Sequence, residues 1–214
     1  MIDDQTLHAL LLRHAPLRPT ALVPALRAFH ADDELPLWLA LEEACGAQLS
    51  APFFAVAWPG AQALARALSD GVVDVRGRRV CDLGCGSGLA AIAAARQGAD
   101  VVAVDVDPLA LGCARLLARE HGVSVETRIG DATDPNAVDN ADVVVAGDVV
   151  YNRNTGLAFA ACVRAWKSEG RTVVLADSGR PFFDPAGLPE RLRFDVDVPR
   201  AVEGVSTRIV RLFF

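Results

Sequence analysis

The sequence predicts an α/β protein built on a doubly wound, mostly parallel sheet of seven strands whose last strand is antiparallel. Two observations carry this prediction. After residue 60, short apolar runs alternate regularly with helical segments, which is the order of a parallel sheet covered by helices. The two final segments instead alternate apolar and polar residues, and a short stretch with Pro and Gly joins them, which predicts a hairpin.

The chain divides into two parts near residue 55. Residues 1–54 are expected to form a helical extension or lid, because prolines interrupt its short helical runs. We expect helices over residues 6–15, capped by Asp3 or Asp4, and over residues 37–48.

Residues 55–214 are expected to form the core domain. Its predicted strands are apolar or alternating runs at residues 79–83, 101–105, 124–129, 142–147, 172–176, 191–198 and 206–213. Its predicted helices lie at residues 61–69, 89–97, 109–121 and 157–167.

Composition narrows the class of protein. A length of 214 residues suits one sizeable domain, and a net charge of −6 argues against a nucleic-acid partner. Five cysteines without a CxxC pair indicate reduced core residues rather than disulfides, and neither they nor the four histidines show metal spacing. The acidic start lacks the pattern of a signal peptide, and no apolar run reaches about 20 residues. We therefore expect a cytoplasmic protein with no membrane partner and no metal.

The segment VCDLGCGSGLAAIAA, residues 80–94, reads as strand, glycine loop and helix. Gly84, Gly86 and Gly88 let the backbone turn sharply and approach a ligand closely. The helix start beyond them offers unpaired N–H groups to a carboxylate or a pyrophosphate. Asp82 distinguishes the two, because its charge would repel pyrophosphate but suits the amino group of a methionine moiety. The loop therefore favours S-adenosylmethionine.

Two further carboxylates follow strand ends. Asp105 ends the next apolar strand, where a carboxylate accepts hydrogen bonds from ribose hydroxyls. Asp131 follows the third strand, where it can accept a bond from an exocyclic amine of adenine, and the N–H of Ala132 can serve a ring nitrogen. Acidic residues at such positions are often simple helix caps. Several in the right order favour a nucleoside cofactor.

With these residues in view, the chain resembles the class I S-adenosylmethionine-dependent methyltransferases, which share a Rossmann-like fold. Among them it is similar to the family of electron-transfer-flavoprotein β-subunit lysine methyltransferases and its bacterial relatives. The resemblance runs from about residue 30 to the end. It is carried by PFFAVAWPGAQALARAL at 52–68, GDVVY at 147–151, LADSGRPFF at 175–183 and EGVSTRIVRLFF at 203–214.

The resemblance implies roles for the matching positions. Trp58 should pack beside the methionine end of the cofactor, and Asp148 with Tyr151 should face the methyl acceptor. The residues expected to bind S-adenosylmethionine are Trp58, Asp82, Gly84, Cys85, Gly86, Gly88, Leu89, Asp105, Val106, Asp131, Ala132 and Gly147.

The expected reaction is methylation of a lysine side chain in a protein such as electron transfer flavoprotein β-subunit, by a monomeric enzyme. A lysine must first lose its proton, since its free pKa is about 10.4. Asp148 could orient the ammonium and take or relay that proton, or the proton could pass to water. Tyr151 could hydrogen-bond the amine. Asp148 could equally be a loop carboxylate, Tyr151 a packing residue, and Trp58 part of a turn before a helix.

The chain departs from the family pattern in ways that leave the acceptor open. Val150 stands where an aromatic residue is usual, an asparagine is missing from LARE at 117–120, and the first thirty residues match poorly. The alternatives are a small-molecule or RNA methyltransferase, a nicotinamide-dependent oxidoreductase and a non-catalytic binding module. GDVVYN lacks the prolines common in RNA methyltransferases, and Leu89 replaces the third glycine of a dinucleotide loop.

Overall fold

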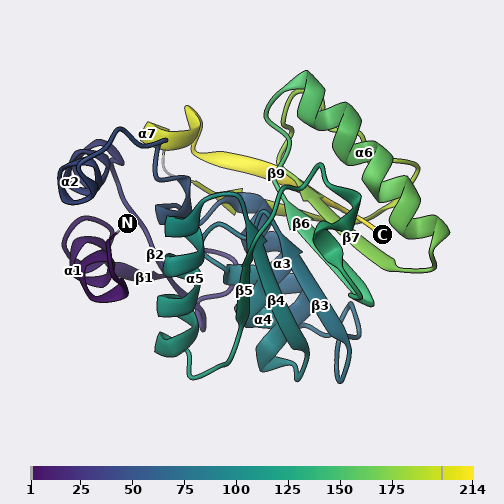
Figure 1. Ribbon diagram of the computed structural model, residues 1–214. Helices are drawn as coiled ribbons and strands as arrows, with labels where there is room; N and C mark the ends of the chain where they lie inside the picture. The colour runs from purple at the N-terminus through teal and green to yellow at the C-terminus, as the bar shows by residue number, and fades with distance from the viewer. Residues whose placement is uncertain (1, 199) are drawn as a thin grey trace.

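The computed structural model describes residues 2–198 and 200–214 and confirms the predicted sheet (Figure 1). The strands are β3 (Arg79–Leu83), β4 (Asp100–Asp105), β5 (Glu126–Ile129), β6 (Val143–Gly147), β7 (Thr172–Asp177), β8 (Glu190–Asp197) and β9 (Thr207–Phe213). Their spatial order is β5-β4-β3-β6-β7-β9-β8. Pairing is parallel from β5 to β7, whereas β9 is antiparallel to both β7 and β8. The reversed strand predicted from the final hairpin pattern is therefore present.

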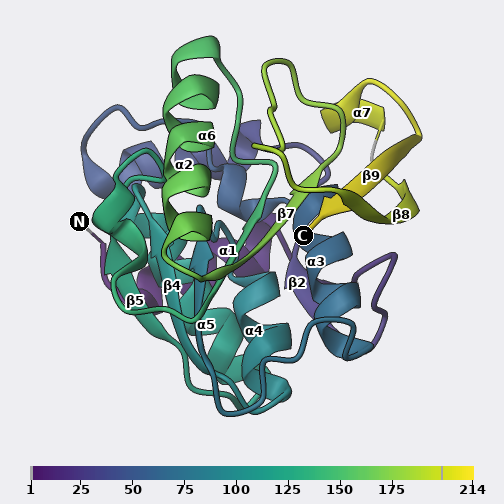
Figure 2. The same ribbon diagram turned by 90° about the vertical axis from the view of Figure 1, so that its right-hand side faces the viewer.

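Helices cover both faces of this sheet (Figures 1 and 2). The helices are α3 (Pro59–Ser69), α4 (Leu89–Arg96), α5 (Pro108–Glu120) and α6 (Arg153–Ser168). The first three share one apolar cluster, and α6 belongs to a second. Successive side chains of a strand point to opposite faces. In β3, accordingly, Val80 lies in the first cluster and Cys81 in the second. Burial on both faces explains why the central strands read as continuous apolar runs.

The strand order creates a crevice at one edge of the sheet. The chain passes from β3 to β4 on one side of β3, and β6 pairs with β3 on its other side. In open α/β sheets, ligands bind at such a reversal, beyond the carboxyl ends of the strands. The glycine loop after β3 and the GDVVY run after β6 both lie at this edge.

The extension before residue 55 contains the two predicted helices and also a small sheet that was not predicted. Helices α1 (Asp4–His14) and α2 (Leu35–Cys45) are present, but a two-stranded antiparallel sheet lies between them. It consists of β1 (Leu17–Pro19) and β2 (Arg27–Phe29). Prolines stop the first helix, and the intervening turn is closed by the Thr20 hydroxyl, which donates to the Val23 carbonyl at 2.8 Å.

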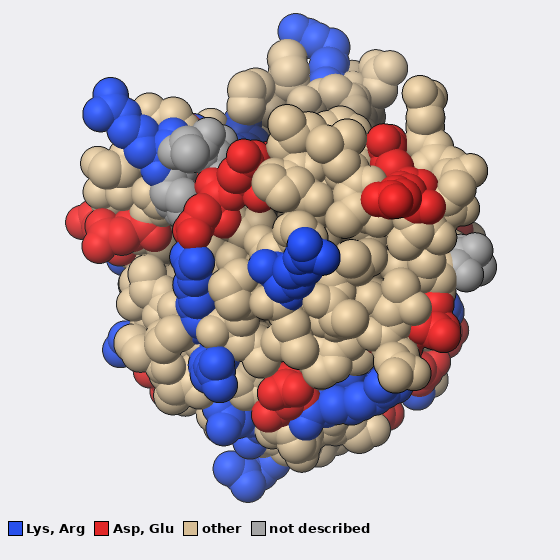
Figure 3. Space-filling model, turned by 90° about the vertical axis from the view of Figure 1, so that its left-hand side faces the viewer, with Lys and Arg blue, Asp and Glu red and all other residues tan. Residues whose placement is uncertain are grey.

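The extension packs onto the core domain rather than standing apart. Leu7, Leu11 and Leu37 lie in the same apolar cluster as α3, α4 and α5. The Asp4 carboxylate adds ion pairs to Arg115 and Arg119 of α5, at 2.8 and 2.9 Å. Figure 3 shows the face on this side of the molecule, where basic and acidic side chains are interspersed. The two parts therefore share one continuous core.

Several smaller features complete the description. The segment joining β8 and β9 contains a short helix, α7 (Arg200–Glu203), and single turns of 3-10 helix form η1 (Phe53–Ala55) and η2 (Pro135–Val138). The five cysteines are free thiols. Within the described ranges, no helix combines the length and apolar character needed to cross a bilayer, and no cluster of potential metal ligands occurs.

Candidate functional site

The glycine loop takes a backbone path that side chains would block. Gly84 and Gly88 have φ values of 66° and 78°, in the left-handed region. A Cβ at Gly84 would lie 2.6 Å from Cγ1 of Val149, and a Cβ at Gly88 would lie 2.8 Å from that of Ala114. Gly86 differs, because a Cβ there would meet only the Phe54 backbone, at 3.9 Å. The open side of the loop is therefore at Gly86.

Asp82 lies beneath this loop at the end of β3, only 3% exposed. Its Oδ2 accepts a hydrogen bond of 2.9 Å from the N–H of Ala91 in the first turn of α4. Burial, with a smaller contribution from the charge of Asp105, raises the pKa of Asp82 to about 7. None of the ion pairs among the described residues includes Asp82. A buried carboxylate without a cationic partner is suited to pair with a cationic group of a ligand.

Asp105 ends β4 beside the loop, as predicted. Its Oδ2 accepts from the N–H of Gly86 at 2.9 Å, and its Oδ1 accepts from the N–H of Asp107 at 3.0 Å. The N–H of Gly130 donates to the Asp105 carbonyl at 3.0 Å and ties in the segment after β5. The carboxylate thus holds the loop in place and keeps lone pairs for a ligand.

The residues expected around an adenine ring lie farther along the same edge. Val106 follows β4 and is 58% exposed, so its side chain can contact a ligand at this edge. Asp131 follows β5, and its Oδ1 accepts 2.8 Å bonds from the N–H and hydroxyl of Thr133. Ala132 is half-buried and packs against the second apolar cluster. The strand order therefore brings Val106, Asp131 and Ala132 to one end of the crevice.

Three other residues that were predicted to bind the cofactor, Cys85, Leu89 and Gly147, face the protein interior. For Gly147, this is the direction in which a Cβ would point. Leu89 is fully buried and Cys85 is 5% exposed, and burial raises the pKa of the Cys85 thiol well above its usual value. Gly147 lies against α3, where a Cβ would come within 2.9 Å of the Gly60 carbonyl carbon. Only the backbone of these residues is available to a ligand.

Asp148 follows β6 with a φ of 54°, a left-handed conformation that strains a residue with a Cβ. Its contacts explain why the strain is tolerated. Oδ2 accepts from the N–H of Gly60 at 2.8 Å, and Oδ1 accepts from the N–H and hydroxyl of Ser178 at 2.9 and 2.7 Å. The side chain is 4% exposed. Asp148 therefore joins β6, the start of α3 and the turn after β7.

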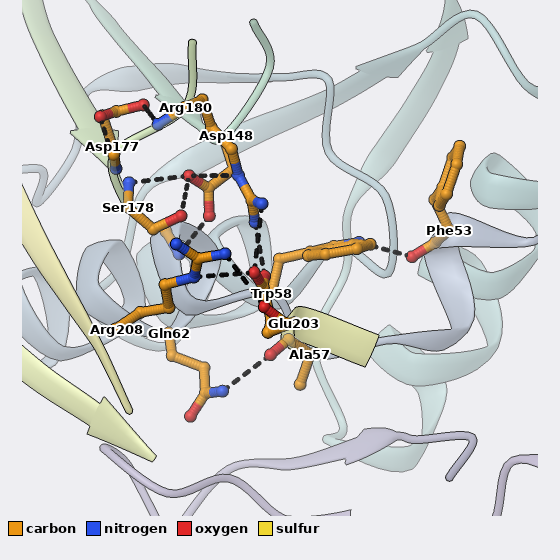
Figure 4. Close-up of polar contacts among 12 residues, drawn as sticks. Phe53, Ala57, Trp58, Gln62, Asp148, Asp177, Ser178, Arg180, Glu203 and Arg208 are labelled. Carbon is orange, nitrogen blue, oxygen red and sulfur yellow. Dashed lines mark hydrogen bonds and ion pairs between the residues drawn. The ribbon is translucent and has the colours of Figure 1, made fainter. Parts of the chain in front are cut away.

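Trp58 precedes α3 and is half-buried (Figure 4). Its Nε1 donates to the Phe53 carbonyl at 2.8 Å. The guanidinium carbon of Arg180 lies 5.2 Å from the centre of its ring, within the range of a cation–π contact. Arg180 also approaches Asp148, with Nε 3.4 Å from Oδ1. Through Arg180, the structure brings Trp58 and Asp148 together.

Tyr151 is not joined to these residues by a polar contact. Its side chain is 73% exposed, and its hydroxyl makes no hydrogen bond with any described residue. The neighbouring Val150 is 1% exposed in the second apolar cluster, where an aromatic residue is usual in the family pattern. A role for Tyr151 at the acceptor stays a prediction.

Sequence reasoning missed part of this arrangement. Gly60, Ser178, Arg180 and Glu203 all contact predicted site residues or one another. Ser178 and Arg180 lie in the LADSGRPFF run and Glu203 begins the EGVSTRIVRLFF run, so the family resemblance covers both segments but implies no role for these side chains. Nothing in the sequence indicates that these segments meet.

The residues present fit S-adenosylmethionine. Asp82 is a buried carboxylate with a raised pKa, which a cationic amino group would relieve, and Gly86 leaves room above the loop. The N-cap residue of α4, Gly88, has no side chain to cap the helix, and Asp82 accepts the N–H of Ala91, so the N–H groups before Ala91 suit a carboxylate. Pyrophosphate is disfavoured by Asp82 beneath the loop.

Comparison with known proteins agrees with this geometry. A family model described as a methyltransferase domain matches residues 80–170. Electron transfer flavoprotein beta subunit lysine methyltransferase from Xenopus laevis is 40% identical over 141 residues, which cover 62% of this chain and 54% of the relative. The mouse protein of the same name is 33% identical over 149 residues, covering 67% and 57%. The chain thus spans about half the length of these curated relatives.

Solved structures show the same fold. The magnesium protoporphyrin IX methyltransferase of Synechocystis PCC 6803, with bound S-adenosylhomocysteine, matches with a TM-score of 0.53 at 17% identity, covering 72% of this chain and 82% of that one. TrmN from Thermus thermophilus matches with a TM-score of 0.51 at 28% identity, covering 72% and 47%. The matching domain, the similar relatives and the sheet are those of a class I S-adenosylmethionine-dependent methyltransferase.

Proposed function

We propose that this chain transfers a methyl group from S-adenosylmethionine to the side-chain amine of a lysine in a protein. One observation carries the proposal. Val149 of the GDVVY run packs on the glycine loop so closely that a Cβ at Gly84 would lie 2.6 Å from it. The run that resembles the acceptor segment of the lysine methyltransferases is therefore directly beside the cofactor loop.

The cofactor would be held by residues from three strand ends. Asp82 would face its amino group, the start of α4 its carboxylate, Asp105 its ribose and Asp131 with Ala132 its adenine. Val106 would pack on the adenine ring, and Trp58 would lie beside the methionine end. When bound, S-adenosylmethionine supplies a sulfonium methyl group that an amine can displace in line. The chain itself contributes approach geometry and exclusion of water.

The charge around Asp148 suits a cationic acceptor. Figure 4 shows three carboxylates, those of Asp148, Asp177 and Glu203, around two guanidinium groups, those of Arg180 and Arg208. Such an excess of negative charge favours an approaching lysine ammonium. The lone pairs of Asp148 already accept bonds from Gly60 and Ser178. We therefore assign Asp148 the task of attracting the lysine ammonium by its charge; the amine then loses its proton to water before it attacks the methyl group.

The substrate proposal follows the relatives. The curated proteins at 33–40% identity carry the name of a lysine methyltransferase of electron transfer flavoprotein β-subunit. We propose a protein substrate of this kind, acted on by a monomer in the cytoplasm without nucleic acid. Tyr151 would contact the incoming segment from its exposed position after β6.

The test is incubation of the purified chain with methyl-labelled S-adenosylmethionine and electron transfer flavoprotein β-subunit, followed by mass spectrometry of the labelled peptide. We expect a gain on a lysine of about 14 Da per unlabelled methyl group, increased by the isotope mass when the methyl group is labelled. A parallel reaction with nuclease-treated lysate separates protein from RNA acceptors, and Gly86→Arg provides the inactive control. Label that disappears after nuclease treatment would contradict the proposal, as would absence of label from both the β-subunit and the lysate.

A further inference from the structure

The turn after β7 holds the backbone of Arg180 in one position. Asp177, the last residue of β7, accepts a bond from the N–H of Gly179 at 2.8 Å and one from the N–H of Arg180 at 3.2 Å. Asp177 is 5% exposed, and burial raises its pKa. The direction in which the Arg180 side chain leaves the sheet is therefore determined by β7 itself.

The Arg180 guanidinium is bound on two edges and one face (Figure 4). Nη1 and Nη2 donate to Oε2 and Oε1 of Glu203 at 3.2 and 2.6 Å, which is a two-pronged pair. Nε lies 3.4 Å from Oδ1 of Asp148, and the guanidinium carbon lies 5.2 Å from the centre of the Trp58 ring. The Arg180 side chain is only 20% exposed. One side chain thus contacts two predicted site residues.

Glu203 anchors this arrangement from a distant segment. It lies in α7, between the two strands of the final hairpin, and its side chain is 3% exposed. Besides the two hydrogen bonds from Arg180, the Glu203 carboxylate accepts a hydrogen bond of 2.9 Å from Nε of Arg208 in β9. A buried carboxylate with several charge-assisted bonds is costly to displace. The hairpin therefore fixes Arg180 through Glu203.

We propose that Arg180 is a positioning residue of the acceptor site. It holds the Trp58 ring and the Asp148 carboxylate in fixed positions relative to each other, and the β8–α7–β9 hairpin serves the site by anchoring Arg180 through Glu203. The acceptor part of this inference rests on the proposed function, whereas the hold on Trp58 does not. Lysine cannot replace arginine here, because an ammonium group lacks the planar fork and the face that stacks on an indole.

The first experiment measures Trp58 in the protein without cofactor. The fluorescence of Trp58 is obtained by subtraction: the signal of each protein carrying Trp58→Phe is subtracted from that of the same protein with Trp58. The subtraction removes the signals of Trp38 and Trp166, which both proteins contain. Arg180→Gln, Arg180→Lys and Glu203→Gln should each increase quenching of Trp58 by the neutral quencher acrylamide by about twofold, because the guanidinium no longer covers the ring. Arg193→Gln is the matched control, since it removes an arginine of the same hairpin that pairs with Glu190 and leaves Glu203 and its bonds to Arg180 intact. It should leave Trp58 quenching unchanged.

The second experiment separates acceptor turnover from cofactor binding. In Arg180→Lys, we expect kcat for the lysine acceptor to fall about tenfold or more, because small misplacements of site groups slow transfer strongly. The Kd for S-adenosylhomocysteine should rise by about threefold at most, because Asp82 and Asp105 are untouched and only the packing of Trp58 on the methionine end is loosened. Arg180→Lys keeps the charge, so a melting temperature close to that of the wild type shows that it has folded.

The outcomes separate the two levels of inference. Unchanged Trp58 quenching in folded Arg180→Lys overturns the proposal, and so does unchanged kcat in an active enzyme. Loss of cofactor binding in proportion to turnover also overturns it, because that pattern indicates general damage. If the wild-type chain methylates no lysine, the proposed function fails, while increased Trp58 quenching still supports the hold of Arg180 on the ring.

Discussion

The two sides of the crevice are built from contacts of different range. On the glycine-loop side, at the ends of β3, β4 and β5, the polar contacts join residues close in sequence. Ala91 and Asp82 are 9 positions apart, and Gly86 and Asp105 are 19 apart. On the β6–β7 side, Gly60 and Asp148 are 88 positions apart, and Ser178 and Asp148 are 30 apart. Backbone groups dominate the first side, and side-chain ion pairs are added on the second.

This difference suggests that the two sides of the crevice have different functions, cofactor binding on the glycine-loop side and acceptor turnover on the β6–β7 side. The loop side is formed by one strand–loop–helix unit and its neighbour, so its shape follows from local backbone geometry. The β6–β7 side needs α3, β6, β7 and the final hairpin to be in place together. Substitutions on the loop side should therefore affect cofactor binding, whereas substitutions on the β6–β7 side should affect turnover and stability more broadly. Five predictions follow from this separation, beginning with the largest expected effect.

Gly86→Arg should abolish cofactor binding while the fold survives. The new side chain would leave the loop on its open side, where only the Phe54 backbone is near, and occupy the cofactor space. We expect S-adenosylhomocysteine affinity, measured by calorimetry, to fall by more than about 100-fold, while the positive φ of 51° costs about 1–2 kcal/mol of stability. Gly122→Arg, at φ 64° in open space after α5, is the matched control for backbone strain. Binding that survives in Gly86→Arg would place the cofactor elsewhere.

Asp148→Asn should slow turnover and weaken the fold, but leave cofactor affinity nearly intact. An amide keeps one acceptor oxygen, and it loses the charge that faces Arg180. We expect kcat to fall about 10- to 100-fold and the free energy of unfolding to fall by about 1–3 kcal/mol, as for a buried charged acceptor. Urea denaturation and single-turnover kinetics measure the two effects. A large rise in the Kd for S-adenosylhomocysteine would erase the distinction between the two sides.

Cofactor binding should depend on pH through Asp82. The pKa of Asp82 is about 7 in the protein without cofactor, and a cationic amino group beside it would favour the ionised form. Below pH 7, binding must therefore release a proton. We expect affinity at pH 6 to be about tenfold weaker than at pH 8, and calorimetry in buffers of different ionisation enthalpy should detect the proton.

The same pKa makes a prediction for stability. The folded-state pKa of Asp82 lies above its ordinary value of 3.8, so ionisation of this group costs the folded state. That cost appears as pH rises from about 4 to about 7 and is constant at higher pH. Asp82→Asn removes it, so the variant should gain stability relative to the wild type as pH rises through this range, by on the order of 4 kcal/mol at pH 8. A pH-independent difference would contradict the assignment.

Tyr151→Phe should have the smallest effect. With 73% of the side chain exposed and no hydrogen bond to a described residue, loss of the hydroxyl should change the free energy of unfolding by less than about 0.5 kcal/mol. If Tyr151 contacts the acceptor, KM for the protein substrate should rise about two- to fivefold. Unchanged kinetics would remove Tyr151 from the acceptor site and leave that site to the buried residues around Asp148.

Much of the fold could be predicted because its signals are local. β3 was predicted with the same bounds as observed, since an apolar run between polar residues and a glycine loop defines both ends. Helix α6 begins four residues earlier than predicted, at Arg153, because the Asn152 side chain caps it by accepting from the Thr155 N–H. The β1–β2 sheet was missed, because strands of three residues carry almost no periodic signal.

The sequence by itself determined the order of strands and helices, the reversed final strand, the glycine loop and the carboxylates at the ends of β3, β4 and β5. Each depends on residues within about one strand–helix unit, where periodicity and backbone propensity are strong. Only the tertiary structure decided that Asp148 takes the N–H of Gly60, and that Arg180 lies between Trp58 and Glu203. Those contacts join segments far apart in the chain, and side-chain pairing at such separations leaves no periodic signal in a single sequence.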